Sequence, residues 1–333
     1  MAATSTTETW DAAWTLTMRA KRKRLTDNIS DAYPTIDRFR KAGIMEVENG
    51  GKEIQEDLMY ALGSSEWFDG FDVLATGSTD GITAAFYNFR YNATPIVISM
   101  TEEKEARKSD SAMKLLEAKT KQAMTKSFDT INAAIHGAQS GKSVLGLQDI
   151  VAESSGTTLG GINASSETWW EPQRTDFADA YTNFHTTAAT TTRSDGPTAM
   201  GIVWNNASEA NDKTNLIITS MTYYGAYESL FEGHGFTRFT TTSGRSGPNF
   251  GIGAEGDITF RGAPVIGDRD CVSDSMYLLN TKYLKLKIQA GLNFAKTPFK
   301  EPSNQLAKVA FVVVGVQLVT NNRRRQGLLY DLA

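Results

Sequence analysis

The longest regular pattern in the chain covers residues 109–136, where apolar side chains recur every three to four positions. That spacing places them on one stripe of an α-helix, and the segment contains neither Gly nor Pro. Ser109 or Asp110 can cap its first amides, and Gly137 can end it. At about 1.5 Å per residue the predicted helix is roughly 40 Å long, so we expect it to be the spine of the fold.

A period near two replaces this pattern over residues 46–100 and predicts three strands, at 52–62, 82–91 and 94–100. Alternate positions of the first strand are apolar apart from Glu56, which predicts that one of its faces packs on a core.

The connection between the first two of these strands, residues 64–81, is far longer than the usual hairpin loop of about 2–5 residues. It carries Trp67, Phe68 and Phe71 among acidic residues and glycines. Long loops with exposed aromatic side chains are typical of functional or contact surfaces. We favour a long two-stranded hairpin that projects from the body; the alternative is a meander whose loop folds back over the core.

Short alternating segments fill the second half of the chain. The predicted strands are 202–204, 216–219, 258–260 and 283–288, and the predicted helices are 176–186 and 220–231. Residues 236–256 are rich in Gly, Ser and Thr and predict a loop, whereas 309–316 form an apolar run typical of a strand buried on both faces. Because there is no internal repeat and no clean linker, we expect two interleaved subdomains. The last strand is expected to return to the first subdomain.

Composition is that of a folded soluble protein: 333 residues, 40% hydrophobic and 22% charged. No apolar run approaches the ~20 residues of a membrane helix, so we expect no membrane association. The N-terminus lacks the layout of a secretory signal, so we expect the protein to be synthesised inside the cell. The single cysteine, Cys271, excludes an intrachain disulfide and is expected to pack as a small hydrophobic residue.

The net charge of -4 gives no overall positive field for nucleic acid, so positive charge is local. Residues 19–24 hold five basic side chains in six positions, and residues 323–325 are all Arg. One interpretation is that both clusters are surface segments whose charges are solvated or ion-paired. The alternative is that they make electrostatic contacts with acidic neighbouring subunits or with a polyanion. The basic residues that we single out are Arg22, Arg24, Arg323, Arg324 and Arg325.

Residues 1–40 are expected to form an arm rather than a domain. Trp10 and Trp14 lie on one helical face of a polar terminal segment, which cannot bury them by itself. They dock either on the arm's own domain or on a neighbouring chain.

Two glycine-rich segments resemble nucleotide-binding loops but fit poorly. Residues 137–143, GAQSGKS, have one residue too few for the Walker pattern and follow a helix, so a helix cap and turn is the better interpretation. Residues 251–256, GIGAEG, match GxGxxG, but a β-branched segment follows where a helix is required. A flexible loop is expected there.

Candidate catalytic chemistry is sparse. Asp268 and Asp270 would share a face of a strand and could bind a divalent ion, but no third ligand is evident, and a turn with solvated charges is favoured. His136, His185 and His234 stand far apart, without a nucleophile or zinc motif. We expect no catalytic residue, metal or cofactor, and a metal-dependent enzyme that uses the two aspartates remains an alternative.

The order of segments resembles the major capsid proteins of tailed bacteriophages with the HK97-like fold. The phrases that carry this resemblance are LTDNIS in the arm, GGKEI at the hairpin, the long helix, GLQDIV, GGINASSETWW, YYGAYESLF, FRGAPVIGDRD, MYLLNTKYLKL and VGVQLVTNNRRRQGLLYDL. Together they cover the chain from about Leu25 to its end.

The resemblance implies an α+β architecture in five parts. These are an N-terminal arm (1–45), an extended hairpin or E-loop (46–92), a peripheral domain with the spine helix (93–194), an axial domain (195–305) and a return strand with the C-terminal segment (306–333).

The resemblance also implies a structural role without catalysis: self-assembly of hexamers and pentamers into an icosahedral head that encloses DNA without sequence-specific binding. The protein would be made in the host cytoplasm and reside in the virion. A portal, a separately encoded scaffolding protein and, in some relatives, decoration proteins are the expected partners. Lys52, the single hairpin lysine, lies at the base, so covalent cross-linking is not expected. A tail-tube or adhesion subunit is the alternative.

The candidate contact residues are the aromatic side chains of the arm and hairpin and the arginines of both basic clusters. They are Trp10, Trp14, Arg22, Arg24, Trp67, Phe68, Phe71, Arg323, Arg324 and Arg325.

Overall fold

The structure is a computed structural model that describes residues 33–74, 77, 80–105, 109–180, 184, 195–232, 258–303 and 305–332. Four of the candidate contact residues, namely Trp10, Trp14, Arg22 and Arg24, lie outside the described residues, as does the whole predicted loop at 236–256 with its GxGxxG segment.

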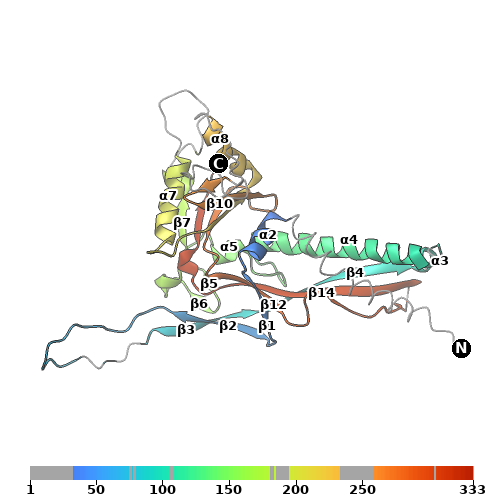
Figure 1. Cartoon of the computed structure of the whole chain (residues 1–333), viewed down its shortest axis with the longest axis horizontal. Coiled ribbons are helices and arrows are strands. Elements are labelled where there is room, and N and C mark those ends of the chain that lie inside the picture. Colours follow the sequence, from blue (N-terminus) through green and yellow to red (C-terminus); the bar gives the residue numbers. More distant parts are fainter. Residues whose placement is uncertain are drawn as a thin grey trace, which may run out of the picture.

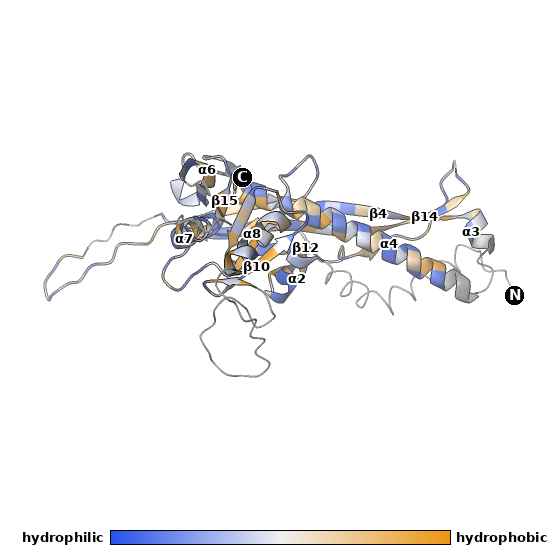
Figure 2. Cartoon of the chain, turned by 90° about the horizontal axis from the view of Figure 1, so that it is seen from above, coloured by the Kyte–Doolittle hydropathy of each residue, from blue (hydrophilic) through white to orange (hydrophobic). Residues whose placement is uncertain are grey.

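The spine predicted from the sequence is present as α4 (Ser109–His136), which ends one residue before Gly137. It packs along β4 (Arg90–Ser99) and β14 (Ala307–Thr320), and these three elements form the elongated unit of the molecule (Figure 1). Polar and apolar residues alternate along α4 (Figure 2). Its buried apolar residues include Leu116, Met124, Phe128, Ile131 and Ile135, as the stripe predicted.

Strands β4 and β14 belong to a five-stranded sheet, which we call the sheet of the elongated unit. Its order is β1 (Met45–Glu48), β12 (Leu284–Gln289), β14 and β13 (Ala295–Lys296), with β4 paired to β14. The pairing of β4 with β14 is antiparallel and runs from Ser99 opposite Ala307 to Arg90 opposite Val316.

The expectation that 309–316 is buried on both faces is wrong for the first half of this segment. Burial alternates along β14 up to Val313, with Phe311 exposed, because α4 covers only one face of the β4–β14 pair there. From Val314 onward every residue of the strand is buried, since β12 and the rest of the body surround it.

A second sheet of six strands forms the upper unit in Figure 1. Its order is β7 (Gln173–Asp176), β15 (Gly327–Tyr330), β11 (Ser275–Leu279), β8 (Leu216–Ser220), β10 (Ala263–Asp268) and β9 (Thr259–Phe260). Helices α7 (Gly196–Ala207) and α8 (Met221–Glu232) pack on it, and a separate hydrophobic cluster forms its core.

The strand predicted at 202–204 is wrong, because these residues lie within α7. Pro197 stands in the first turn of this helix, where its fixed φ is favourable. Ala199, Met200, Val203 and Ala207 are buried at spacings of three to four, so the Ile-Val-Trp triplet was too short to reveal the helical period.

The hairpin consists of β2 (Glu53–Met59) and β3 (Ile82–Asn88), which pair antiparallel over their whole length. It projects from the body, as expected, to the left in Figure 1, whereas α4 runs to the right, and residues 60–74 extend beyond the paired strands. Burial along β2 alternates strictly, and Glu56 is buried with its apolar neighbours.

Short elements complete the described chain. They are α2 (Pro34–Lys41), α3 (Met100–Glu105), α5 (Leu147–Ile150), β5 (Thr158–Leu159), β6 (Ile162–Asn163), η1 (Thr168–Trp170), α6 (Phe177–Ala180) and η2 (Arg323–Arg325). The helix predicted at 176–186 is described only over α6, and most of its remainder lies outside the described residues. Within the described part of the chain, none of the helices has the length and apolarity that a membrane crossing requires.

Candidate interaction surfaces

The tip of the hairpin exposes several large apolar side chains. Trp67 and Phe71 have relative exposures of 103% and 105%, and Phe68 and Val73 are also exposed. Leaving such side chains in water forgoes about 1.5–3 kcal/mol each relative to burial. The tip is therefore a strong candidate for an interface with another molecule.

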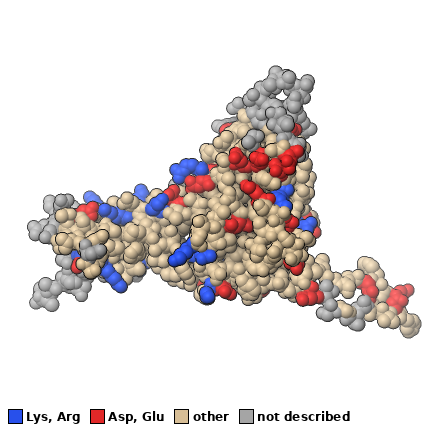
Figure 3. Space-filling model, turned by 180° about the vertical axis from the view of Figure 1, so that it is seen from behind, with Lys and Arg blue, Asp and Glu red and all other residues tan. Residues whose placement is uncertain are grey.

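The same tip is acidic. Residues 60–81 contain four carboxylates and no Lys or Arg, and Asp and Glu are visible at the hairpin tip in Figure 3. A backbone turn organises part of it, because the amide of Asp69 donates to Asp72 Oδ2 at 2.9 Å. A partner surface for this tip would combine apolar area with positive charge.

The root of the hairpin is fixed to the body. Ile54, Leu58 and Tyr87 are buried, and the hydroxyl of Tyr87 donates to the carbonyl oxygen of Thr320 at 2.8 Å. Burial raises the pKa of Tyr87 well above its usual value, so this hydroxyl remains a donor at neutral pH. A firmly packed root holds the tip away from the body.

A charge network also joins the root to the sheet of the elongated unit. The Lys287 ammonium on β12 lies 3.3 Å from Glu56 on β2, 2.8 Å from Glu46 and 3.1 Å from Glu48 on β1. Burial acts to lower the pKa of Lys287, but hydrogen bonds to Glu46 and Glu48 raise it overall. In the sequence Glu56 is visible only as a break in an apolar face, because its partner Lys287 lies in a distant segment.

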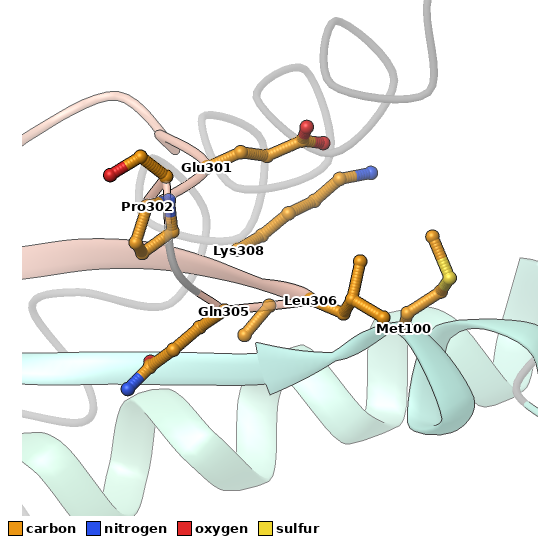
Figure 4. A pocket seen from close by; sticks show the side chains of 8 residues that line it. Met100, Glu301, Pro302, Gln305, Leu306 and Lys308 are labelled. Carbon is orange, nitrogen blue, oxygen red and sulfur yellow. The ribbon is translucent and has the colours of Figure 1, made fainter.

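The elongated unit presents an exposed apolar face opposite α4. Tyr91 and Val97 on β4 and Phe311 on β14 are exposed there. At the end of the unit, Met100 and Leu306 are exposed beside a hollow of about 370 Å³ (Figure 4). The hollow is lined by Met100, Glu301, Pro302, Ser303, Gln305, Leu306, Ala307 and Lys308.

Positive charge accompanies this unit. Lys114 and Lys121 are exposed on α4, and Lys and Arg gather over the elongated unit on the face shown in Figure 3. On that face, Asp and Glu gather over the upper unit and the hairpin tip. On this face the charges of opposite sign are thus separated, which the small net charge conceals.

The expectation that Arg323 is a surface contact residue is wrong, because its relative exposure is 0%. Its guanidinium donates to the carbonyl oxygens of Ile150 at 2.6 Å, Asp149 at 2.9 Å and Thr157 at 3.1 Å, and to Thr157 Oγ1 at 2.6 Å. Burial lowers the pKa of Arg323 to about 10. This side chain shapes the segment around α5 instead of meeting a partner.

The other two arginines of the cluster have different environments. Arg324 is exposed, whereas Arg325 is partly buried and forms an ion pair with Glu209. Of the three arginines, only Arg324 has an exposed side chain that a partner could contact.

The turn that the sequence favoured at Asp268 and Asp270 is present, but the charge of Asp268 is not solvated. Asp268 is buried and accepts hydrogen bonds from Thr35 and Asn132, and the latter amide also donates to Asp270 Oδ2 at 2.8 Å. These partners come from elements that are remote in sequence, so local pattern gave no sign of them. Among the described residues there is no group of three or more His, Cys, Asp or Glu side chains placed to hold a metal.

The two remaining sequence features have structural roles. Residues 137–143 follow α4 as a turn, in which the amide of Gln139 donates to Asp149 Oδ2 at 2.7 Å. Cys271 is buried, as expected, and burial raises the pKa of its thiol to about 12.

Comparison with known proteins identifies the fold. The sequence matches no family model and no curated protein. Among solved structures, a chain of the cyanophage A-1(L) capsid asymmetric unit is similar with a TM-score of 0.61 and 16% identity, covering 86% of this chain and 90% of that one.

Two further structures agree. A chain from the capsid of an empty GTA particle has a TM-score of 0.59 and 12% identity and covers 89% of each chain. A chain of the encapsulin complex from Synechococcus elongatus PCC 7942 has a TM-score of 0.53 and 9% identity, covering 87% of this chain and 86% of that one. The chain therefore has the α+β fold of these capsid and encapsulin chains, which confirms the fold class expected from the order of its segments.

Proposed function

We propose that the chain is a structural major capsid protein, which assembles with copies of itself into a closed shell around DNA. The observation that carries the proposal is the hairpin tip, whose fully exposed Trp67 and Phe71 find no cover within the described chain of a capsid-like fold. Aromatic side chains dominate interface energies once they are desolvated.

The charge and apolar surfaces suggest how neighbours meet. The acidic, aromatic tip of one copy complements the exposed apolar face and the lysines of the elongated unit of the next copy. Such a head-to-tail contact is heterologous, and it closes into rings when the rotation between copies divides a full turn. Rings of five and six would then share further contacts to form the shell.

Multiple weak contacts account for the stability of such a shell. A typical interface hides about 800 Å² per partner, and each subunit would touch several neighbours at once. Loss of one contact leaves the others engaged, which keeps the subunit in place. In this proposal Trp67, Phe68, Phe71 and Arg324 are contact residues, and Trp10, Trp14, Arg22 and Arg24 of the arm keep that role as a prediction.

The proposal assigns the five segments to the parts of an HK97-like subunit. Residues 1–45 are the arm, 46–92 the E-loop, 93–194 and 306–333 the peripheral domain, and 195–305 the axial domain. Partners would be a separate scaffolding protein and a portal, with the virion as the final location. The chain would enclose DNA without reading its sequence, and it would use no catalytic residue or cofactor.

Negative-stain electron microscopy of the purified protein, expressed with and without a co-expressed scaffolding protein, tests the proposal. Closed shells are the expected product. Tubes, fibres or isolated rings would instead favour a tail-tube or adhesion subunit. A monomer that binds a divalent ion in a titration would favour the enzyme alternative at Asp268 and Asp270.

A further inference from the structure

The connection between β1 and β2 contains an asparagine followed by a glycine, Asn49 and Gly50. This is the only Asn-Gly pair in the sequence. It lies in residues 49–52, which separate the end of β1 from the start of β2 at the root of the hairpin. Asn49, Gly50 and Gly51 are all exposed. Water therefore reaches both the asparagine side chain and the backbone that follows it.

The side chain of Asn49 has no partner that would hold it away from the backbone. Within the described part of the chain it makes no hydrogen bond. Gly50 has φ of +82°, and a Cβ added there would meet nothing within 4 Å, so the space beside this residue is open. The amide nitrogen of Gly50 can therefore approach the side-chain carbonyl carbon of Asn49.

A single backbone hydrogen bond restrains this turn. The amide of Gly50 donates to the carbonyl oxygen of Glu48 at 3.0 Å, and the same oxygen also accepts from the amide of Ala290 at 2.8 Å. A hydrogen bond that closes a turn of only three residues is strongly bent, and bent hydrogen bonds are weak. Since residues 49–52 have no other backbone hydrogen bond to the described residues, local opening of the turn costs little free energy.

We propose that Asn49 is a site of spontaneous deamidation. The Gly50 nitrogen loses its proton and attacks the side-chain carbonyl carbon of Asn49. The new C–N bond closes a succinimide ring, and the side-chain nitrogen leaves as ammonia. Water then opens the ring at either of its carbonyl groups, which gives aspartate or isoaspartate. Neither step oxidises or reduces the chain, so the reaction needs only the chain and water.

Both products alter the root of the hairpin. Each adds a carboxylate next in sequence to Glu48, whose own carboxylate lies 3.1 Å from the Lys287 ammonium. Isoaspartate also routes the backbone through the former side chain, which lengthens the connection between β1 and β2 by one methylene. An aged chain therefore joins its hairpin to the sheet differently from a newly made one. This inference concerns the chemistry of the single chain and does not depend on the proposed function.

Peptide mass spectrometry of the full chain, incubated at pH 8 and 37 °C, tests the proposal. Trypsin releases residues 42–52, in which Asn49 is the only asparagine. The expected result is the mass gain of an amide converted to an acid, in two species that separate as aspartate and isoaspartate. Asn163 is the internal control, because it is exposed but precedes Ala164 and accepts a hydrogen bond from the amide of Ser165. Since the Cβ of alanine hinders the attack, conversion at Asn49 should be at least about tenfold faster.

Asn49→Gln is the matched variant, because it keeps an exposed amide but its longer side chain does not close the same ring. It should show no mass gain over residues 42–52. A synthetic peptide of residues 42–52 gives the rate without the fold, and conversion in the full chain within about tenfold of that rate is expected.

Conversion of the synthetic peptide with no conversion of Asn49 in the full chain would overturn the proposal, because the turn would then protect the site. An equal mass gain in Asn49→Gln would also overturn it. So would aspartate without isoaspartate, because the reaction would then not pass through the ring.

Discussion

Lys287 on β12 and Glu56 on β2 form a buried ion pair at 3.3 Å that joins the sheet of the elongated unit to the root of the hairpin. Glu46 and Glu48 also contact the Lys287 ammonium. The two partners of the pair are therefore not equivalent. The lysine has two other carboxylates, whereas within the described part of the chain the only other ion pair of Glu56 is with Lys285, at 3.5 Å.

This asymmetry predicts unequal effects of removing each partner. Lys287→Met leaves the buried Glu56 carboxylate with only the 3.5 Å ion pair to Lys285. It is expected to lower the free energy of unfolding by about 3 kcal/mol. Glu56→Gln leaves Lys287 with two carboxylates and is expected to cost about 1 kcal/mol. Urea denaturation at pH 7 measures both, and equal losses would contradict the assignment of Glu56 as the dependent partner.

Arg323 is expected to be essential for stability, whereas its neighbour is not. Arg323→Met leaves the carbonyl oxygens of Asp149, Ile150 and Thr157 without their donor and should lower the free energy of unfolding by about 3 kcal/mol. Arg324→Met removes an exposed charge and should change it by less than about 0.5 kcal/mol. Thermal unfolding of the two variants side by side checks this, and similar melting temperatures would contradict it.

Gly160 is expected to be required where the β5–β6 turn meets the hairpin. Its φ is +62°, and a Cβ there would lie 2.8 Å from the Cβ of Ala85 and 3.2 Å from the ring of Tyr87. Gly160→Ala should therefore lower the free energy of unfolding by about 2 kcal/mol, through strain and overpacking.

Gly161→Ala provides the control, because this residue has φ of +83° but open space around it. It carries the backbone strain alone, about 1 kcal/mol. Chemical denaturation of both variants separates backbone strain from overpacking. A smaller loss of the free energy of unfolding in Gly160→Ala than in Gly161→Ala would show that the hairpin root does not pack as described.

Acid should weaken the hydrogen bonds that Asp268 accepts from Thr35 and Asn132. Burial acts to raise the pKa of this carboxyl, but interactions with His136, the backbone of Asp270 and Thr35 lower it well below its usual range. Because the folded-state pKa is lowered, the stabilisation is present above the unfolded-state pKa near about 4 and is lost as the pH falls below it.

The corresponding variant is Asp268→Asn, which should lower the free energy of unfolding by about 2 kcal/mol at pH 7. Its difference from the wild type should shrink as the pH is lowered from 4 to 2. Urea denaturation across this range measures the difference, and a constant gap would mean that the charge of Asp268 does not contribute.

The elements that could be predicted from the sequence are those whose signal is local and long. The helix at 109–136 has an uninterrupted period and a glycine after it, and the structure has it at the same bounds. The triplet at 202–204 is too short to distinguish a strand from one buried turn of a helix, and it belongs to α7.

The candidate sites depended on tertiary partners that no local pattern contains. Arg323 was expected at the surface because it stands in a run of arginines, yet its acceptors belong to residues 149–157. Asp268 was expected in a solvated turn, yet Thr35 and Asn132 enclose it. Exposure of Trp67 and Phe71 could be predicted, because a long acidic loop offers them no apolar neighbours.

The hairpin tip provides the last prediction. Trp67→Ala and Phe71→Ala remove side chains that contribute nothing to the fold of the single chain, so each should change the free energy of unfolding by less than about 0.5 kcal/mol. Both should impair assembly, because the removed rings are the proposed contacts. Met221→Ala, at an exposed apolar residue of the upper unit, is the control and should assemble normally.

Sedimentation velocity of the wild type beside the Trp67→Ala/Phe71→Ala double variant tests the central claim most directly. The account predicts that the wild type sediments as large closed particles, while the folded double variant remains as single subunits or small rings. Particles of equal size and yield from both proteins would contradict it.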